Sequence, residues 1–170
     1  MLFQSETVTV EKDRDGSAFL KLDVHGQTHN TLSLRVLADL DAALDAVAAE
    51  PRLPLLIVRS GKKGFCAGAD LHDFLTLTDP PAAEAFCERG QRLYDKLSSL
   101  PMPTLAVIHG PCIGGAVELV LACDYRLVFD KPDTRLQLPE VTLGLLPAWG
   151  GTQRLPRVVG LRRALEMILQ

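Results

Sequence analysis

The sequence is poor in aromatic residues, which make up 5% of its 170 residues, and it contains only four cysteines. No two of these, Cys66, Cys87, Cys112 and Cys123, form a Cys-x-x-Cys motif, and no Cys/His group has zinc-site spacing. The low count excludes a disulfide-rich scaffold. We therefore expect reduced thiols, a cytoplasmic location and no bound metal.

Signals for secretion, membrane insertion and nucleic-acid binding are missing as well. The N-terminal residues lack the basic stretch followed by an apolar one that marks a signal peptide. The longest stretch without a charged residue, 97–117, is interrupted by three prolines, so we do not expect it to cross a membrane. With 18 basic and 21 acidic residues, the chain also lacks the overall positive charge that phosphate backbones attract.

Several nucleotide-binding and hydrolase motifs are absent. The chain has no Walker A pattern, no Gly-x-Gly-x-x-Gly and no Gly-x-Ser-x-Gly. These absences argue against nucleotide hydrolysis, dinucleotide binding and serine-hydrolase chemistry. The four histidines have no metal-ligand spacing, and structural roles are the simplest interpretation for them.

The hydrophobic pattern predicts one α/β domain over residues 1–170. Short apolar runs alternate with helix-period segments, which is typical of a mostly parallel sheet covered by helices. The expected elements are a hairpin over 7–24, strands at 55–58, 104–108, 126–129 and 136–138, and helices at 34–47, 81–100, 114–121 and 150–170. The last helix pattern reaches the final residue without a cap signal, which suggests a truncation inside a larger fold.

Two glycine-rich loops each follow an apolar strand. They cover residues 64–71 and 110–118. Ligands of parallel α/β sheets lie beyond the carboxyl ends of the strands, and small residues let a ligand approach backbone N–H groups. If the loops converge, they form an oxyanion hole. The alternative is that the glycines serve turns and helix packing.

Two glutamates are candidates for proton transfer. Glu118 lies in an otherwise apolar helix start, and Glu140 follows Pro139 in a loop. Apolar surroundings raise carboxyl pKa values towards neutral pH, where acid–base catalysis works best. The alternative is a dipole-complementing role for Glu118 and a surface position for Glu140. Trp149 is expected either to line a pocket or to pack in the core.

Four segments together resemble the crotonase superfamily, the enoyl-CoA hydratase/isomerase family. They are residues 29–32, 64–71, 110–124 and 138–156. The resemblance implies a ClpP/crotonase-like ββα-superhelix core, C-terminally truncated because family domains continue into further helices. Within the family, the segments are most similar to the N-terminal hydratase part of the bacterial fatty-acid-oxidation complex α subunit.

The resemblance also implies roles for individual residues. Ala69 and Gly115 match the residues whose backbone N–H groups hold the thioester oxygen of an acyl-CoA. Glu118 and Glu140 match the two catalytic glutamates, which hold one water between them. Further positions match the substrate-binding segments of the family: Ala67, Gly68, Asp70, Leu71 and Gly114.

The implied function is hydration of 2-enoyl-CoA thioesters in fatty acid β-oxidation, with no cofactor beyond the coenzyme A of the substrate. One alternative is a Δ3-Δ2 enoyl-CoA isomerase that relies mainly on Glu140. Another is a non-catalytic acyl-CoA-binding fragment of a multifunctional 3-hydroxyacyl-CoA dehydrogenase. The implied partners are the acyl-CoA and either a trimer-based homo-oligomer or an assembly with a thiolase or dehydrogenase. Without the C-terminal helices, apolar surface is expected to be exposed.

Overall fold

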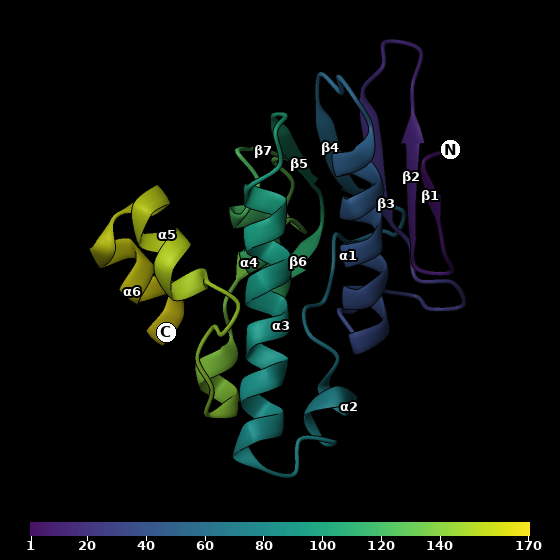
Figure 1. Cartoon of the computed structure of the whole chain (residues 1–170). Helices are drawn as coiled ribbons and strands as arrows, with labels where there is room; N and C mark the ends of the chain where they lie inside the picture. Colours follow the sequence, from purple (N-terminus) through teal and green to yellow (C-terminus); the bar gives the residue numbers. More distant parts are fainter.

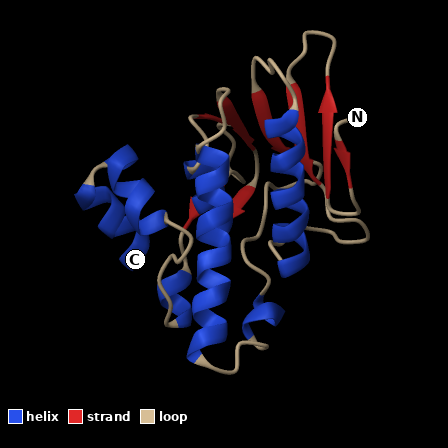
Figure 2. Cartoon of the chain, viewed as in Figure 1, coloured by secondary structure: helices blue, strands red, loops and turns tan.

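The main sheet has six strands, in the order β1-β2-β3-β4-β5-β7, in a computed structural model that describes all residues, 1–170 (Figures 1 and 2). Strands β1 to β3 pair antiparallel, and β3, β4, β5 and β7 pair parallel, as expected for a mostly parallel sheet. The strand bounds are β1 (Phe3–Gln4), β2 (Val8–Lys12), β3 (Ala18–Leu22), β4 (Leu56–Ser60), β5 (Thr104–Ile108) and β7 (Tyr125–Val128).

The predicted N-terminal hairpin is confirmed as β2 and β3. Val8 pairs with Leu22 and Val10 with Leu20, and all four side chains are buried. Because the residues between them point to the opposite side, the hairpin has one buried face and one face that is more exposed to solvent. The short β1, which adds to the edge of this hairpin, was not predicted, because two residues carry no periodic signal.

Helices α1 (Leu34–Ala49) and α3 (Pro80–Ser98) lie side by side against the sheet (Figure 1). Helix α1 begins at the predicted residue and α3 one residue before its predicted start, and Ser33 and Asp79 cap their first free N–H groups. The buried face of α1 recurs at helical spacing through Leu37, Leu40 and Leu44.

The remaining helices are shorter than α1 and α3. They are the short α2 (Leu71–Phe74), α4 (Gly115–Leu121), the 3-10 turn η1 (Glu140–Leu143), α5 (Gly151–Val159) and α6 (Leu161–Leu169). The prediction of one helical region over 150–170 was wrong in detail. Gly160 adopts a positive φ of 83° between α5 and α6, which breaks the helix into two.

A second, small sheet brings distant segments together. Strand β6 (Pro111–Ile113) pairs parallel with β8 (Arg135–Gln137), and an isolated bridge joins Cys66 to Cys112. A further bridge joins Leu32 to Ala69. The two glycine-rich segments therefore lie beside each other, although the bridged residues Cys66 and Cys112 are 46 positions apart in the sequence.

All four cysteines are free thiols, as predicted. Burial raises the pKa of Cys66 to about 12. Asp124 accepts hydrogen bonds from the backbone N–H and the side-chain hydroxyl of Thr104 and so links the end of α4 to the start of β5. None of the helices has both the length and the apolar content needed to span a membrane.

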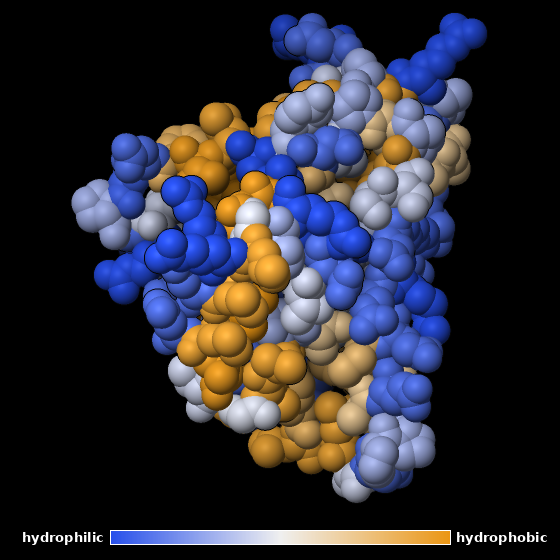
Figure 3. Space-filling view, turned by 90° about the vertical axis from the view of Figure 1, so that its left-hand side faces the viewer, coloured by the Kyte–Doolittle hydropathy of each residue, from blue (hydrophilic) through white to orange (hydrophobic).

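The side of the molecule that carries α5 and α6 shows a band of apolar atoms (Figure 3). Large apolar side chains are exposed in this part of the chain, as expected from the sequence: Leu143, Leu145, Leu146, Val158, Leu161, Leu165 and Leu169.

Candidate active site

A cavity of about 240 Å³ lies among α2, α3, the start of α4 and the segment that follows β8. Its walls are mostly apolar, and two carboxylic acids face it, those of Glu118 and Glu140. The other lining residues are Ala67, Gly68, Ala69, Leu71, Phe74, Leu77, Ala83, Phe86, Cys87, Ile113, Gly114, Gly115, Pro139, Leu143, Leu145, Leu146, Ala148 and Trp149. An apolar cleft with a few convergent polar groups is typical of a small-molecule site.

The first loop, residues 64–70, directs one backbone N–H group into this cavity. Leu32 donates to the carbonyl of Gly68 and accepts from the N–H of Asp70, so it bonds on both sides of Ala69. In such a parallel bridge the N–H of the central residue points to the opposite edge. Ala69 makes no hydrogen bond through its own N–H and lines the cavity, so this donor is free for a ligand.

The second loop, residues 110–115, supplies another free donor at the start of α4. Gly115 is the first residue of α4, so its N–H has no intrahelical acceptor. Gly114 before it adopts a φ of +55°, a conformation that favours glycine. Both residues line the cavity, as the prediction of an oxyanion hole requires.

Glycine is needed where the two loops meet. Gly68 has a φ of +94°, and a Cβ atom there would lie 2.7 Å from the carbonyl oxygen of Ile113 in the second loop. A side chain at Gly68 would therefore push the loops apart. The packing alternative for the glycines is correct here, and it is compatible with the oxyanion role.

Glu118 is almost fully buried, with 2% of its surface exposed. Its Oε1 accepts hydrogen bonds from the backbone N–H groups of Trp149 (2.9 Å) and Gly151 (2.7 Å) at the start of α5. Burial raises its pKa to about 7, and the charge of Glu140 adds to this effect, while the two N–H donors oppose it. Glu118 is thus fixed in place and able to exchange a proton near neutral pH.

Glu140 approaches the same space from η1. Its Oε1 would lie 3.0 Å from a Cβ atom on Gly114, so its carboxyl group sits against the second loop. Its Oε2 is buried without a hydrogen-bond partner, and burial raises the pKa of this carboxyl as well. The surface-loop alternative for Glu140 is therefore wrong, since the group faces the cavity.

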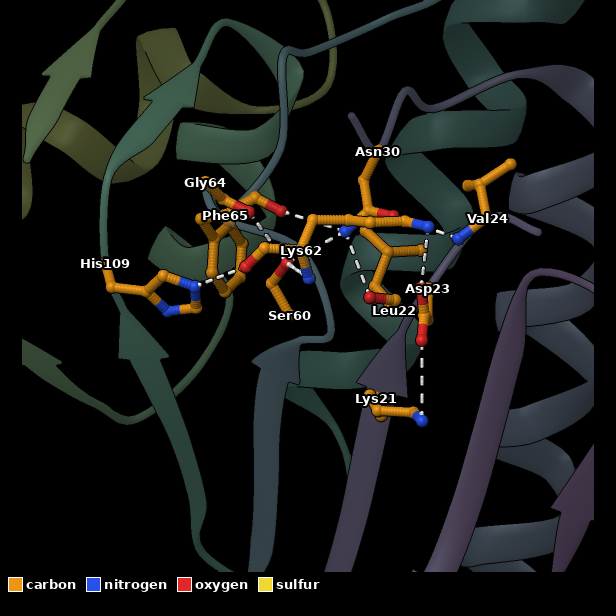
Figure 4. Close-up of polar contacts among 10 residues, drawn as sticks. All are labelled: Lys21, Leu22, Asp23, Val24, Asn30, Ser60, Lys62, Gly64, Phe65 and His109. Carbon is orange, nitrogen blue, oxygen red and sulfur yellow. Dashed lines mark hydrogen bonds and ion pairs between the residues drawn. The ribbon is translucent and has the colours of Figure 1, made fainter. Parts of the chain in front are cut away.

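A buried amide, Asn30, holds the first loop in place (Figure 4). Its Oδ1 accepts from the N–H of Val24, and its Nδ2 donates to the carbonyls of Leu22 and Phe65 and to the hydroxyl of Ser60. These bonds tie the ends of β3 and β4 to the loop. The sequence offered Asn30 only as part of a matching segment, because its partners are scattered along the chain.

The same close-up shows how the outer part of this region is anchored (Figure 4). The Nζ of Lys62 forms an ion pair with Oδ1 of Asp23 at 2.8 Å. The backbone carbonyl of Lys62 contacts Nε2 of His109, also at 2.8 Å. No histidine lines the cavity.

Of the predicted substrate-binding residues, Ala67, Gly68, Leu71 and Gly114 line the cavity. Asp70 does not. Its Oδ1 accepts from the N–H of His72 at 3.0 Å and caps α2, and this hydrogen bond is the main cause that lowers its pKa. Contact of Asp70 with a ligand outside the cavity stays a prediction.

Most of the apolar wall was not identified from the sequence. Phe74, Leu77 and Phe86 come from α2, α3 and their connection, while Leu143 belongs to η1. Trp149 fulfils both of its expected roles, because it is 2% exposed in the core and also lines the cavity. One signal could have been used: Gly90 lies on the buried face of α3, where a Cβ atom would collide with the Trp149 ring.

The assembled groups suit a reaction in which a carbonyl oxygen gains negative charge. Two unpaired N–H groups converge on one cavity, which is the arrangement that stabilises an oxyanion. Two carboxyl groups with raised pKa values stand beside them and can take up and release protons. No group of three or more His, Cys, Asp or Glu side chains is placed to bind a metal.

A family model described as enoyl-CoA hydratase/isomerase matches residues 15–170. Among curated proteins, the fatty acid oxidation complex subunit alpha of Aliivibrio fischeri is 44% identical over 160 residues, covering 93% of this chain and 23% of the relative. The protein of the same name from Vibrio cholerae is 45% identical over 160 residues, covering 92% and 22%. The chain thus spans about a quarter of the length of these relatives.

Solved structures support the same fold. An enoyl-CoA hydratase from Geobacillus kaustophilus superposes with a TM-score of 0.88 at 36% identity, covering 98% of this chain and 61% of that one. An enoyl-CoA hydratase from Bacillus anthracis gives a TM-score of 0.83 at 32% identity, covering 96% and 62%. The crotonase-type α/β fold expected from the sequence is confirmed.

Proposed function

The chain belongs to the enoyl-CoA hydratase/isomerase family, and on this basis we propose that it hydrates 2-enoyl-CoA thioesters. The observation that carries the proposal is the pair Glu118 and Glu140, which face one cavity beside two unpaired backbone N–H groups. The substrate would place its thioester oxygen at the N–H groups of Ala69 and Gly115. Its 2,3-double bond would then lie at the carboxyl groups.

The two carboxyl groups divide the proton transfers in this proposal. Glu118 accepts two backbone N–H bonds, which favour its charged form and suit it to remove a proton from water. The resulting hydroxide adds to C3, and the electrons of the double bond pass to the thioester oxygen. Glu140, whose Oε2 has no donor, delivers a proton to C2. The product is a 3-hydroxyacyl-CoA, and no cofactor takes part.

The two N–H groups support this step by stabilising the enolate oxygen. Removing one oxyanion donor typically costs about a hundredfold or more in kcat. The apolar walls restrict water near the reacting atoms, which strengthens these hydrogen bonds. They also suit a hydrocarbon acyl chain.

We further propose that this reaction serves fatty acid β-oxidation, as the name of the curated relatives suggests. The 3-hydroxyacyl-CoA product is the substrate of a dehydrogenase, so association with such an enzyme, or with a thiolase, is the expected setting. Formation of a trimer-based homo-oligomer, which the family resemblance implies, stays a prediction.

The direct test is the loss of conjugated-thioester absorbance when crotonyl-CoA is added to the protein. We expect Glu118→Gln to lower the rate by about a thousandfold, since one proton-transfer group is removed. Glu84→Gln is the matched control, because Glu84 is exposed on α3 and makes no ion pair. Equal rates for wild type and Glu118→Gln would rule out the proposed role.

The isomerase alternative gives a different signal in the same variants. A 3-enoyl-CoA gains conjugated absorbance when its double bond moves to C2. If Glu140 alone carries isomerisation, Glu118→Gln keeps this activity while it loses hydration. Acyl-CoA binding without either change in absorbance would favour a non-catalytic binding role.

A further inference from the structure

Tyr94 is a fully buried residue of α3 whose hydroxyl group bonds to the site. Its OH donates to the carbonyl oxygen of Gly115 at 2.8 Å. Burial holds the pKa of this phenol well above its ordinary value, so the hydroxyl keeps its proton at every working pH. A buried tyrosine needs a partner for its OH, and here the partner belongs to the residue that supplies an oxyanion donor.

The backbone hydrogen bonds at the start of α4 fall on Gly114, whose N–H donates to the carbonyl of Gln137 and whose carbonyl accepts from the N–H of Val117. Gly114 and Gly115 lack side chains, and no side chain caps the helix. Glycine has the greatest backbone freedom of any residue, so the N–H of Gly115 needs external restraint to keep its direction. The Tyr94 hydroxyl supplies a restraint on the carbonyl of the same residue.

Trp149 restrains Gly115 from a second side. A Cβ atom on Gly115 would lie 2.5 Å from Cζ3 of the indole, so the ring packs directly against this glycine. The rings of Tyr94 and Trp149 meet edge to face, with centroids 5.7 Å apart and an interplanar angle of 89°. The backbone N–H of Trp149 also holds Glu118, so the same unit contacts both the donor and the carboxylate.

We propose that Tyr94, supported by Trp149, is a positioning residue that aims the Gly115 N–H at the thioester oxygen of the bound acyl-CoA. This proposal rests on the function proposed above and adds a residue of α3 that lies outside the cavity lining. Small misplacements of a reacting group lower rates strongly, so the hydroxyl matters for catalysis as well as for packing.

The test is Tyr94→Phe, which removes the hydroxyl and keeps the ring. We expect kcat for crotonyl-CoA hydration to fall about tenfold while KM changes by less than about twofold, because the lost alignment acts mainly in the transition state. A second readout is the absorbance of bound 4-dimethylaminocinnamoyl-CoA. This chromophore shifts to longer wavelength when its carbonyl is polarised, and the shift should be smaller in Tyr94→Phe.

Tyr125→Phe is the matched control, since the other tyrosine of the chain is 63% exposed on β7. It should keep the wild-type kcat and the wild-type shift. If Tyr94→Phe lowers only the unfolding midpoint and keeps both values, its role is structural and the proposal is wrong. If Tyr94→Phe does not fold, Trp149→Phe tests the same restraint, with a reduced shift expected and an unchanged one contradicting it.

The chromophore also separates the two proposals, because its shift requires binding but no turnover. A wild-type protein that binds and shifts it without hydrating crotonyl-CoA would contradict hydration alone, and the comparison with Tyr94→Phe would still decide the positioning role. A wild-type protein that gives no shift would overturn both proposals.

Discussion

The two loops of the site offer the same kind of group, a free backbone N–H, but the chain supports them differently. The first loop is held by hydrogen bonds that converge on the amide of Asn30. The second is held by backbone pairing with β8 and Cys66, and at Gly115 by the Trp149 ring and a hydroxyl bond from Tyr94. The first loop thus depends on a buried side-chain amide, whereas the Gly115 donor of the second is restrained by aromatic side chains.

The carboxyl groups that follow the two donors in the sequence also have different environments. Asp70 follows Ala69, caps α2 and has a lowered pKa, with a backbone hydrogen bond as the main cause. Glu118 follows Gly115, is buried and has a raised pKa, with desolvation as the main cause. The difference shows that environment, and not residue type, prepares only one of the two carboxyls for proton transfer.

The largest effect should come from breaking the polar support. Asn30→Ala leaves the carbonyl of Phe65 and the N–H of Val24 without their partner, while the carbonyl of Leu22 keeps its bond from the N–H of Gly61. We expect it to lower the free energy of unfolding by about 4 kcal/mol, because each orphaned buried group costs about 1–3 kcal/mol. Urea unfolding measures this loss.

Gln27→Ala is the matched control for Asn30→Ala, since it removes an exposed amide only three residues earlier in the chain. We expect its unfolding free energy to stay close to that of wild type. A similarly small effect for Asn30→Ala would show that the first loop does not depend on its polar network.

The next largest effect should be a pH dependence of stability that comes from Glu118, beside the second loop. In the folded chain the pKa of Glu118 is about 7, above its ordinary value of 4.5. Between these values the folded state keeps a proton that the unfolded chain has released. The stability contributed by this group is therefore fully present below pH 4.5 and is lost as the pH rises through about 7.

Glu118→Gln removes this titration. The unfolding free energy of the variant relative to that of wild type should therefore rise by about 3 kcal/mol between acidic pH and about pH 8. Urea unfolding of both proteins across this range measures the difference. Asp70 has the opposite sign, because its lowered pKa makes stability fall only in acid. A constant difference between Glu118→Gln and wild type would contradict the raised pKa.

The smallest effect should come from Asp70, the N-terminal cap of α2 that follows Ala69. Asp70→Ala removes the acceptor for the N–H of His72 and should cost about 1 kcal/mol, the usual value for a helix cap. Because Leu71 and Phe74 of α2 line the cavity, we expect KM to rise more than kcat falls. Steady-state kinetics on crotonyl-CoA checks this split, and a dominant loss of kcat would place Asp70 closer to the chemistry.

Much of the fold could be predicted because its signals are local. The hairpin and the helices α1 and α3 follow from side-chain period, capping residues and turn residues, all within one segment. The short β1, β6 and η1 were missed, since each depends on contacts with remote segments. The break at Gly160 was missed because the helix pattern continues on both sides of it.

The sequence by itself determined which groups are available for chemistry. The two glycine-rich loops, Glu118 and Glu140 are visible as residue types in a pattern, and their family resemblance is equally a property of the sequence. These features survive any rearrangement of the chain in space, because they depend only on the order of the residues.

Only the tertiary structure decided how these groups work together. It brought Glu118 and Glu140 to one cavity, placed the start of α5 on the Glu118 carboxyl, and set Tyr94 of α3 against Gly115. Such contacts join residues far apart in the chain. The physical reason is that burial and hydrogen-bond partners set a pKa and a donor direction, and both exist only once the chain has packed.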